Sequence, residues 1–164
     1  MSKERTGKAM TYAEYKAERQ KSANDLPIFF AFSSEQLEEE MNKRGLTTDD
    51  TDKIYDIGNG GFCLKKDANT VSEWFNAKDP LDDLMKDQKF AEDAFFYEMC
   101  NHEYGINYQG DWDVCCCFGE EPEFKEYKDG PTYLREMGFS DDIVAAYKNA
   151  KRKYWEEAIE KEWF

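Results

Sequence analysis

The sequence has little of what several protein classes require. Its 164 residues include one histidine and four prolines, and no stretch approaches the roughly 20 consecutive apolar residues of a membrane helix. The opening residues, MSKERTGKAM, have no apolar segment behind their charges. We therefore expect no signal peptide, no membrane contact and a location in the cytoplasm. The five cysteines are then expected to be reduced.

Basic residues are scarce relative to acidic ones. The chain has 22 Lys and Arg against 36 Asp and Glu, a net charge of −14. Residues 67–129 hold 5 basic and 17 acidic side chains, so this segment carries most of the imbalance. Nucleic acids and anionic membranes are bound through Lys and Arg. The composition therefore disfavours direct binding to nucleic acid and is compatible with a basic protein partner.

Aromatic residues are abundant, at 16% of the chain, which argues against a disordered protein. We expect a flexible segment over residues 1–10 and one compact domain over residues 11–164. Capping residues, glycines and prolines predict helices over residues 12–23, 34–44, 68–76, 88–102, 131–137 and 141–163, with a short one after Pro80. Thr11 with Glu14 and Ser33 with Gln36 fit capping boxes at the starts of the first two helices. β-prone runs predict strands over residues 26–32, 53–57, 62–65, 106–108 and 112–118. The second and third runs flank the turn residues Gly58–Gly61 and predict a hairpin. This order predicts an α+β fold, with a small antiparallel or mixed sheet covered by several helices.

The stretch 90–118 is expected to form the centre of the fold. Its helix has an apolar stripe wide enough for burial on most sides, with the wetter side marked by Glu92, Asp93, Glu98 and Glu103. The run Val114–Phe118 is apolar at all five positions, which is typical of a strand covered on both faces. We therefore predict a buried helix followed by a buried strand.

The only histidine suggests one candidate metal site. His102 lies four residues after Glu98, so both side chains are on one helix face. Together with Asp113, which follows the helix, they form a candidate ligand set of Glu98, His102 and Asp113. The alternative is a half-buried histidine that hydrogen-bonds where the helix ends. A single histidine in an acidic protein favours this alternative, and we expect no cofactor.

Three consecutive cysteines, Cys115, Cys116 and Cys117, lie in the predicted strand. Side chains alternate between the faces of a strand, so only Cys115 and Cys117 would share a side. The run lacks the two-residue spacing of zinc ligands. We interpret these cysteines as small buried apolar residues. A nucleophilic cysteine paired with His102 is the alternative.

Two clusters of acidic residues suggest a surface for a partner. Like charges held close together could imitate the phosphates of a nucleic acid, and nearby aromatic residues could anchor an interface. The alternative is a solvated surface that keeps the protein soluble. The candidate partner-binding residues are Asp79, Asp82, Asp83, Asp87, Trp112, Glu120, Glu121, Glu123, Phe124, Glu126, Tyr127 and Asp129.

Three stretches carry a resemblance to known proteins. They are Phe30–Ser33 with Glu35-Gln36, Ile57–Phe62 with Lys65–Asp67, and Phe96–Met99 with Asn101-His102-Glu103-Tyr104. Together they resemble small uncharacterised proteins of bacteriophages and their bacterial hosts, and the N-H-E-Y stretch is the most specific. The resemblance covers about residues 26–118. It implies a phage or mobile-element accessory protein and no particular activity.

Charge and resemblance together suggest a function. We hypothesise a non-enzymatic phage accessory protein that inhibits a host nucleic-acid enzyme or defence protein, such as a CRISPR effector, by binding its basic site. One alternative is a metal-dependent or thiol enzyme centred on Glu98, His102 and Asp113. The other is a structural accessory protein. The helices rich in Tyr and Trp also leave room for a homodimer.

Overall fold

The computed structural model describes residues 9–120 and 126–164. Within these residues the chain forms eight α-helices, two short 3-10 helices and one three-stranded antiparallel sheet, so the predicted α+β class is confirmed. The chain divides into two compact units. The helical unit comprises residues 9–18, 79–120 and 126–164, and the sheet unit comprises residues 19–78. That residues 11–164 form one domain remains a prediction.

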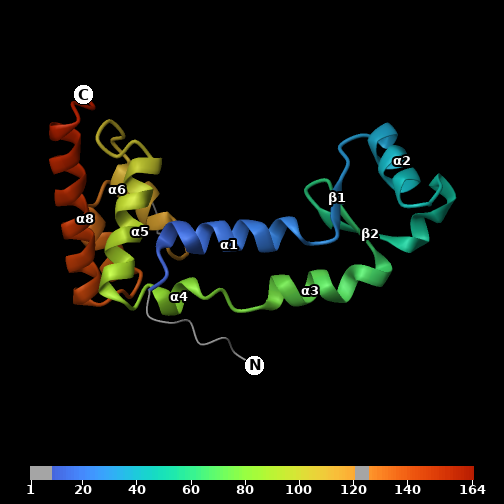
Figure 1. Ribbon diagram of the computed structural model, residues 1–164, viewed down its shortest axis with the longest axis horizontal. Coiled ribbons are helices and arrows are strands. Elements are labelled where there is room, and N and C mark those ends of the chain that lie inside the picture. The colour runs from blue at the N-terminus through green and yellow to red at the C-terminus, as the bar shows by residue number, and fades with distance from the viewer. Residues whose placement is uncertain (1–8, 121–125) are drawn as a thin grey trace. The chain divides into compact units, whose positions relative to one another are not determined.

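The sheet unit contains β1 (Ile28–Phe30), β2 (Ile54–Gly58) and β3 (Gly61–Leu64), in the order β1-β3-β2 (Figure 1). The predicted hairpin around Gly58–Gly61 is confirmed. Its turn requires residues that tolerate positive φ, and Gly58, Asn59 and Gly60 have φ values of 89°, 53° and 77°. The unit also contains α2 (Ser34–Lys43), α3 (Ala68–Asn76) and the 3-10 helices Thr48–Lys53 and Lys65–Asp67.

The buried core of the sheet unit is small. In the sheet unit Phe29, Met41 and Ile54 form a small buried cluster between the sheet and α2.

The first helix, α1 (Tyr12–Asn24), contributes residues to both units. Its predicted capping box is confirmed, since Thr11 Oγ1 accepts from Glu14 N at 3.1 Å and Glu14 Oε2 accepts from Thr11 N at 3.0 Å.

The helical unit is built on two helices that lie side by side (Figure 1). They are α5 (Gln88–Asn101) and α8 (Asp141–Glu160), and small residues such as Ala94 and Ala150 are fully buried there. Small side chains allow close approach, and the rings of Phe95 and Tyr147 pack edge to face at 5.1 Å. The unit also contains α4 (Leu81–Leu84), α6 (Gly110–Cys116) and α7 (Gly130–Glu136).

The prediction of a strand over residues 112–118 is wrong, because this segment forms helix α6 and the turn after it. The residues buried here are Asp111, Val114, Cys115 and Phe118. Their spacing of three, one and three residues is that of one helix face. A short apolar run does not distinguish a strand from a buried helix by periodicity alone. The predicted strand over residues 106–108 is also wrong, since that segment lies in turns.

Among residues 9–120 and 126–164, no helix is both long enough and apolar enough to span a membrane.

Candidate functional site

A buried carboxylate on α5 organises the site. Glu98 was expected on the wetter side of its helix, and this is wrong, because only 1% of the residue is exposed. Its Oε1 accepts hydrogen bonds from Tyr12 Oη and Lys16 Nζ, both at 2.8 Å. Its Oε2 accepts from Asn101 Nδ2 at 3.2 Å. The start of α1 therefore satisfies one carboxylate oxygen and leaves the other facing the end of α5.

These contacts set the charge of Glu98. Burial by itself raises the pKa of a carboxyl group, but hydrogen bonds from Lys16, Tyr12 and Asn101 outweigh that effect and lower the pKa of Glu98 below its ordinary value. The same carboxylate raises the pKa of Lys16, although partial burial of the ammonium acts in the opposite direction. The side chain of Glu98 is therefore an anion at neutral pH.

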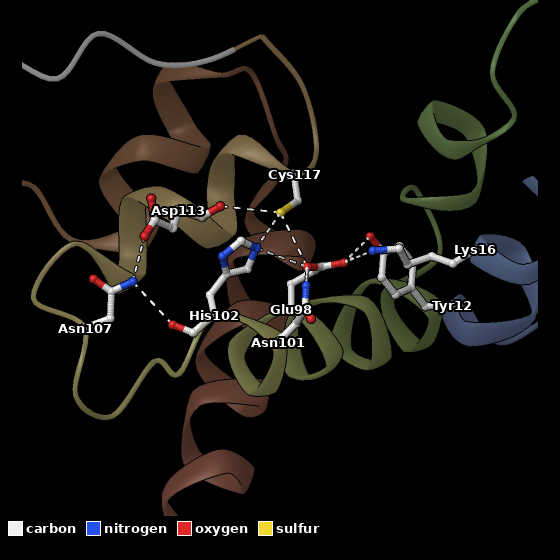
Figure 2. A network of polar contacts seen from close by, with 8 residues as sticks. All are labelled: Tyr12, Lys16, Glu98, Asn101, His102, Asn107, Asp113 and Cys117. Carbon is white, nitrogen blue, oxygen red and sulfur yellow. Dashed lines mark hydrogen bonds and ion pairs between the residues drawn. The ribbon is translucent and has the colours of Figure 1, made fainter. Parts of the chain in front are cut away.

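His102 and Cys117 meet Oε2 of Glu98 (Figure 2). His102 caps the C-terminus of α5, and its Nε2 lies 3.3 Å from Glu98 Oε2. Cys117 caps the C-terminus of α6, and its Sγ lies 3.4 Å from His102 Nε2 and 3.6 Å from Glu98 Oε2. The carboxylate, imidazole and thiol thus form a triangle of potential metal ligands.

Two of the three residues in the candidate ligand set of Glu98, His102 and Asp113 lie together. The structure brings Glu98 and His102 together, but the Asp113 carboxylate accepts a hydrogen bond from Asn107 Nδ2 at 2.6 Å instead (Figure 2). Helix α6 presents Asp113 toward that turn, and the residue one helical turn later, Cys117, faces His102. The main-chain oxygen of Asp113 still contacts Cys117 Sγ at 3.4 Å.

The cysteines also differ from the expected arrangement. Because they lie on a helix rather than a strand, Cys115 and Cys117 do not share a side. Cys115 is fully buried and its Sγ lies 3.8 Å from Gly130 O. Burial, followed by the nearby charge of Glu98, raises the pKa of the Cys117 thiol to about 12. Without a bound cation, Cys117 is therefore a protonated thiol at neutral pH, which weakens the interpretation as a nucleophile.

A second buried carboxylate lies at the start of α6. Asp111 is 3% exposed and accepts hydrogen bonds from three tyrosine hydroxyls. Tyr104 donates at 2.6 Å, Tyr127 at 2.9 Å, and Tyr147 also donates. Burial, followed by the hydrogen bond to Asp111, raises the pKa of Tyr127 to about 12. These bonds tie α6 to α8 and to the segment before α7, so Asp111 has a structural role.

Several of the predicted partner-binding acids stabilise helix starts. The Asp87 carboxylate caps α5 by accepting from Phe90 N at 2.8 Å, and Asp129 caps α7 by accepting from Thr132 N at 2.8 Å. Asp79 accepts from Leu81 N at 2.9 Å and from the hydroxyl of Tyr15 at 2.8 Å. These three acids thus have local roles that account for their positions.

The other candidates are spread over the helical unit. Asp83 pairs with Lys86 at 3.0 Å. Trp112 is partly buried against the core. The main-chain oxygen of Glu126 accepts from Tyr133 Oη at 3.4 Å. Glu121, Glu123 and Phe124 lie outside the described residues.

An open groove brings two of the predicted acids together. It has a volume of about 830 Å³ and contains the charged side chains of Asp82, Lys86, Glu120 and Glu136. Its apolar lining consists of Met85, Phe118, Met137, Phe139 and Ile143. Sequence reasoning found Asp82 and Glu120 but missed Glu136 of α7 and the apolar lining. The apolar residues come from the ends of α4 and α6, the turn between α7 and α8, and the start of α8.

Comparison with known proteins identifies a family whose function is unknown. Residues 11–115 match the model of a family of unknown function, DUF7659, and the chain belongs to that family. No curated protein matches the chain. No solved structure matches it either. The matched region includes Glu98 and His102 of the triangle and ends before Cys117.

Proposed function

We propose, for this member of a family of unknown function, that the protein is a non-enzymatic binding protein that holds a basic segment of a partner in the groove beside α4. The observation that carries the proposal is the lining of that groove. Three carboxylates, on Asp82, Glu120 and Glu136, line the groove together with apolar side chains. Such a lining suits a segment in which Lys or Arg alternates with apolar residues.

The charges beside the groove favour a cationic occupant. Lys86 is the one basic residue of the described lining, and it pairs with Asp83 at 3.0 Å. Lys128 pairs with Glu136 at 2.7 Å from outside the lining. The remaining acids, Asp82 and Glu120, add to the field of a chain with a net charge of −14. A basic partner would therefore be attracted over a distance that shortens as salt is added.

The partner class is proposed from the sequence. Enzymes that act on nucleic acids carry basic clefts, and an acidic protein that occupies such a cleft would inhibit them. The resemblance to bacteriophage proteins adds a context in which host enzymes and defence proteins are targets. The capping roles of Asp79, Asp87 and Asp129 narrow the proposed contact surface to the groove, since these carboxylates are used within the fold.

A pull-down with matched charge variants tests this proposal. The full chain is immobilised, exposed to bacterial lysate at low salt, eluted at high salt, and the eluate is identified by mass spectrometry. Asp82→Lys with Glu120→Lys should abolish capture of the salt-released partner. Glu38→Lys with Glu39→Lys, at two exposed positions of α2, changes the net charge equally and should leave capture intact.

Two results would overturn the groove proposal. Equal loss in both double variants would mean that only overall charge attracts the partner. Unchanged capture in both would mean that the groove is not the binding surface. A partner that stays bound as salt rises would contradict electrostatic attraction.

The second candidate is an enzyme centred on Glu98 and His102, and the placement of Cys117 beside them favours it. A metal-free thiol mechanism requires a thiolate, which the raised pKa of Cys117 opposes. In addition, the same nitrogen of His102 faces both Glu98 and Cys117. In cysteine triads of the protease type the carboxylate and the thiol face opposite ring nitrogens. Rapid alkylation of Cys117 at neutral pH would revive the thiol enzyme.

A further inference from the structure

We propose that Glu98 Oε2, His102 Nε2 and Cys117 Sγ form a binding site for a zinc ion, with a fourth position open to water. The site is independent of the groove proposed above. It is assembled from the last turn of α5 and the residue that ends α6. The three atoms converge on one point from two helices, as Figure 2 shows.

The distances match a tetrahedral ion. Zinc lies about 2.0–2.3 Å from N, O and S ligands, so ligand atoms of a tetrahedral site are separated by about 3.3–3.7 Å. The three separations here are 3.3 Å for N to O, 3.4 Å for N to S and 3.6 Å for O to S. A zinc ion can therefore be accommodated with little movement of the ligands.

Each proton in the triangle serves only some of its contacts. The Cys117 thiol carries one proton, and three acceptors lie within its reach: His102 Nε2, Glu98 Oε2 and Asp113 O. His102 Nε2 either accepts from this thiol or, in the other tautomer, donates to Glu98 Oε2, so it cannot do both. A divalent cation at the centre would contact Nε2, Oε2 and Sγ at once, which no arrangement of the protons achieves.

Neighbouring residues hold the Glu98 carboxylate in place through hydrogen bonds, as the residues around metal ligands do in known metal sites. Tyr12 and Lys16 both bind Oε1 of Glu98, so Oε2 is the oxygen that faces His102 and Cys117. Asn101 donates to Oε2 from the same helix. The Glu98 carboxylate and the Cys117 thiolate together would balance the charge of a zinc ion, and Lys16 adds one positive charge beside them.

The ligand types select the metal. A thiolate, an imidazole and a carboxylate suit zinc, whereas Mg²⁺ and Ca²⁺ prefer oxygen ligands alone. The imidazole side chain is 33% exposed, so water can reach the fourth position. Three protein ligands with an open position are typical of zinc that acts on a substrate, in contrast to closed structural sites.

Binding has a defined proton balance. The Cys117 S–H bond breaks, the sulfur lone pair forms the Zn–S bond, and one proton passes to buffer. Glu98 binds as the carboxylate that it already is, and the imidazole of His102 binds through the lone pair of Nε2. No oxidant or reductant takes part.

Metal titration of the full chain, stripped by chelator and kept reduced, tests the site. Each chain should bind one Zn²⁺ ion and release about one proton at neutral pH. Calorimetry in two buffers of different ionisation enthalpy measures the number of protons released. Co²⁺ should give the visible bands of tetrahedral cobalt and a thiolate-to-cobalt charge-transfer band. Mg²⁺ should not compete.

Paired variants locate the ligands. Cys117→Ser and His102→Ala should each weaken zinc binding by about 100-fold or more, since even a second-shell change costs 10–100-fold. Cys100→Ser, at the exposed cysteine, should change affinity by less than about 3-fold. Asp113→Ala, which removes the ligand suggested by the sequence, should also have little effect. Tyr12→Phe should weaken binding by about 10-fold while keeping the ring in the core.

The outcomes are decisive because metal-free melting curves show which variants fold. Zinc binding that survives Cys117→Ser, or that depends on Asp113, would overturn the assignment. No zinc binding by the folded wild-type chain would overturn it as well. Loss of zinc binding would leave partner capture by the groove unaffected, so failure of this site and failure of the proposed function are distinguishable.

Discussion

The helical unit buries two carboxylates, and their hydrogen-bond partners and surroundings differ. Among the described residues, Glu98 and Asp111 are the charged side chains classed as buried, at 1% and 3% exposure. Asp111 is enclosed by three tyrosine hydroxyls. Glu98 is held on one oxygen by an ammonium and a phenol, and its other oxygen faces the partly exposed His102 and Cys117. The neutral hydroxyls that enclose Asp111 indicate a structural role. The charged and partly exposed groups around Glu98 indicate a carboxylate that can bind a ligand.

Removing Asp111 should produce the largest effect on stability. Asp111→Ala leaves buried tyrosine hydroxyls without their acceptor, and each unsatisfied group costs about 1–3 kcal/mol. We expect a loss of about 3–5 kcal/mol in the free energy of unfolding, measured by urea denaturation. Asp113→Ala, two residues along the same helix, removes one partner of a single hydrogen bond to Asn107 and should cost about 1 kcal/mol. Equal losses in the two variants would contradict the structural role of Asp111.

Each carboxylate has a cysteine from the same run beside it, and the two thiols should differ in reactivity. Cys115 is fully buried and its pKa is raised by burial and by the charge of Asp111. Cys117 is partly exposed. In alkylation of the native protein, mapped by peptide mass, Cys117 should react roughly 10-fold faster than Cys115, and exposed Cys100 faster than both. Faster reaction of Cys115 would contradict the closed character of the Asp111 cluster.

Glu98 should contribute to stability only while it is ionised. Its pKa in the fold is lower than the ordinary 4.5, so its contribution is fully present above that pH and is lost as the pH falls through the lowered value. Glu98→Gln should cost about 1–2 kcal/mol at neutral pH, and the difference from wild type should shrink in acid. Melting temperatures at decreasing pH measure this, with Glu92→Gln on the same helix as control. A constant difference would show that Glu98 is not the group that titrates.

Tyr127 should give the smallest effect. It is 59% exposed although its hydroxyl bonds to Asp111. Tyr127→Phe should cost about 0.5–1 kcal/mol, because Asp111 keeps two other donors. Urea denaturation measures it, with Tyr108→Phe at the 80% exposed Tyr108 as a control expected to be neutral. A loss as large as that of Asp111→Ala would mean that the network acts as one unit.

The elements that sequence reasoning predicted correctly are those with local signals. Thr11 with Glu14, Ser33 before α2, and Pro80 before α4 marked helix starts that the structure has. The turn at Gly58–Gly61 marked the hairpin. Each signal depends on hydrogen bonds or φ values within a few residues, so no knowledge of the rest of the fold was needed.

Helix α6 was missed because its pattern contains a buried acid. Counted as inward, Asp111 completes the helical spacing with Val114, Cys115 and Phe118. Counted as a surface acid, it leaves an apolar run that resembles a strand. Nothing near Asp111 in sequence reveals the hydroxyl of Tyr147, which lies 36 positions away. The same error left open which of the three cysteines lies beside His102.

The sequence by itself determined the α+β class, the excess of acidic charge and the pairing of Glu98 with His102, since composition and a spacing of four residues on a helix are local properties. Only the tertiary structure decided which acids are buried, which cap helices and which line a groove. It also decided that Cys117 rather than Asp113 completes the triangle. The reason is physical: the ionisation of a carboxylate and its capacity to bind depend on donors such as Tyr12 and Lys16, which lie more than 80 residues away along the chain.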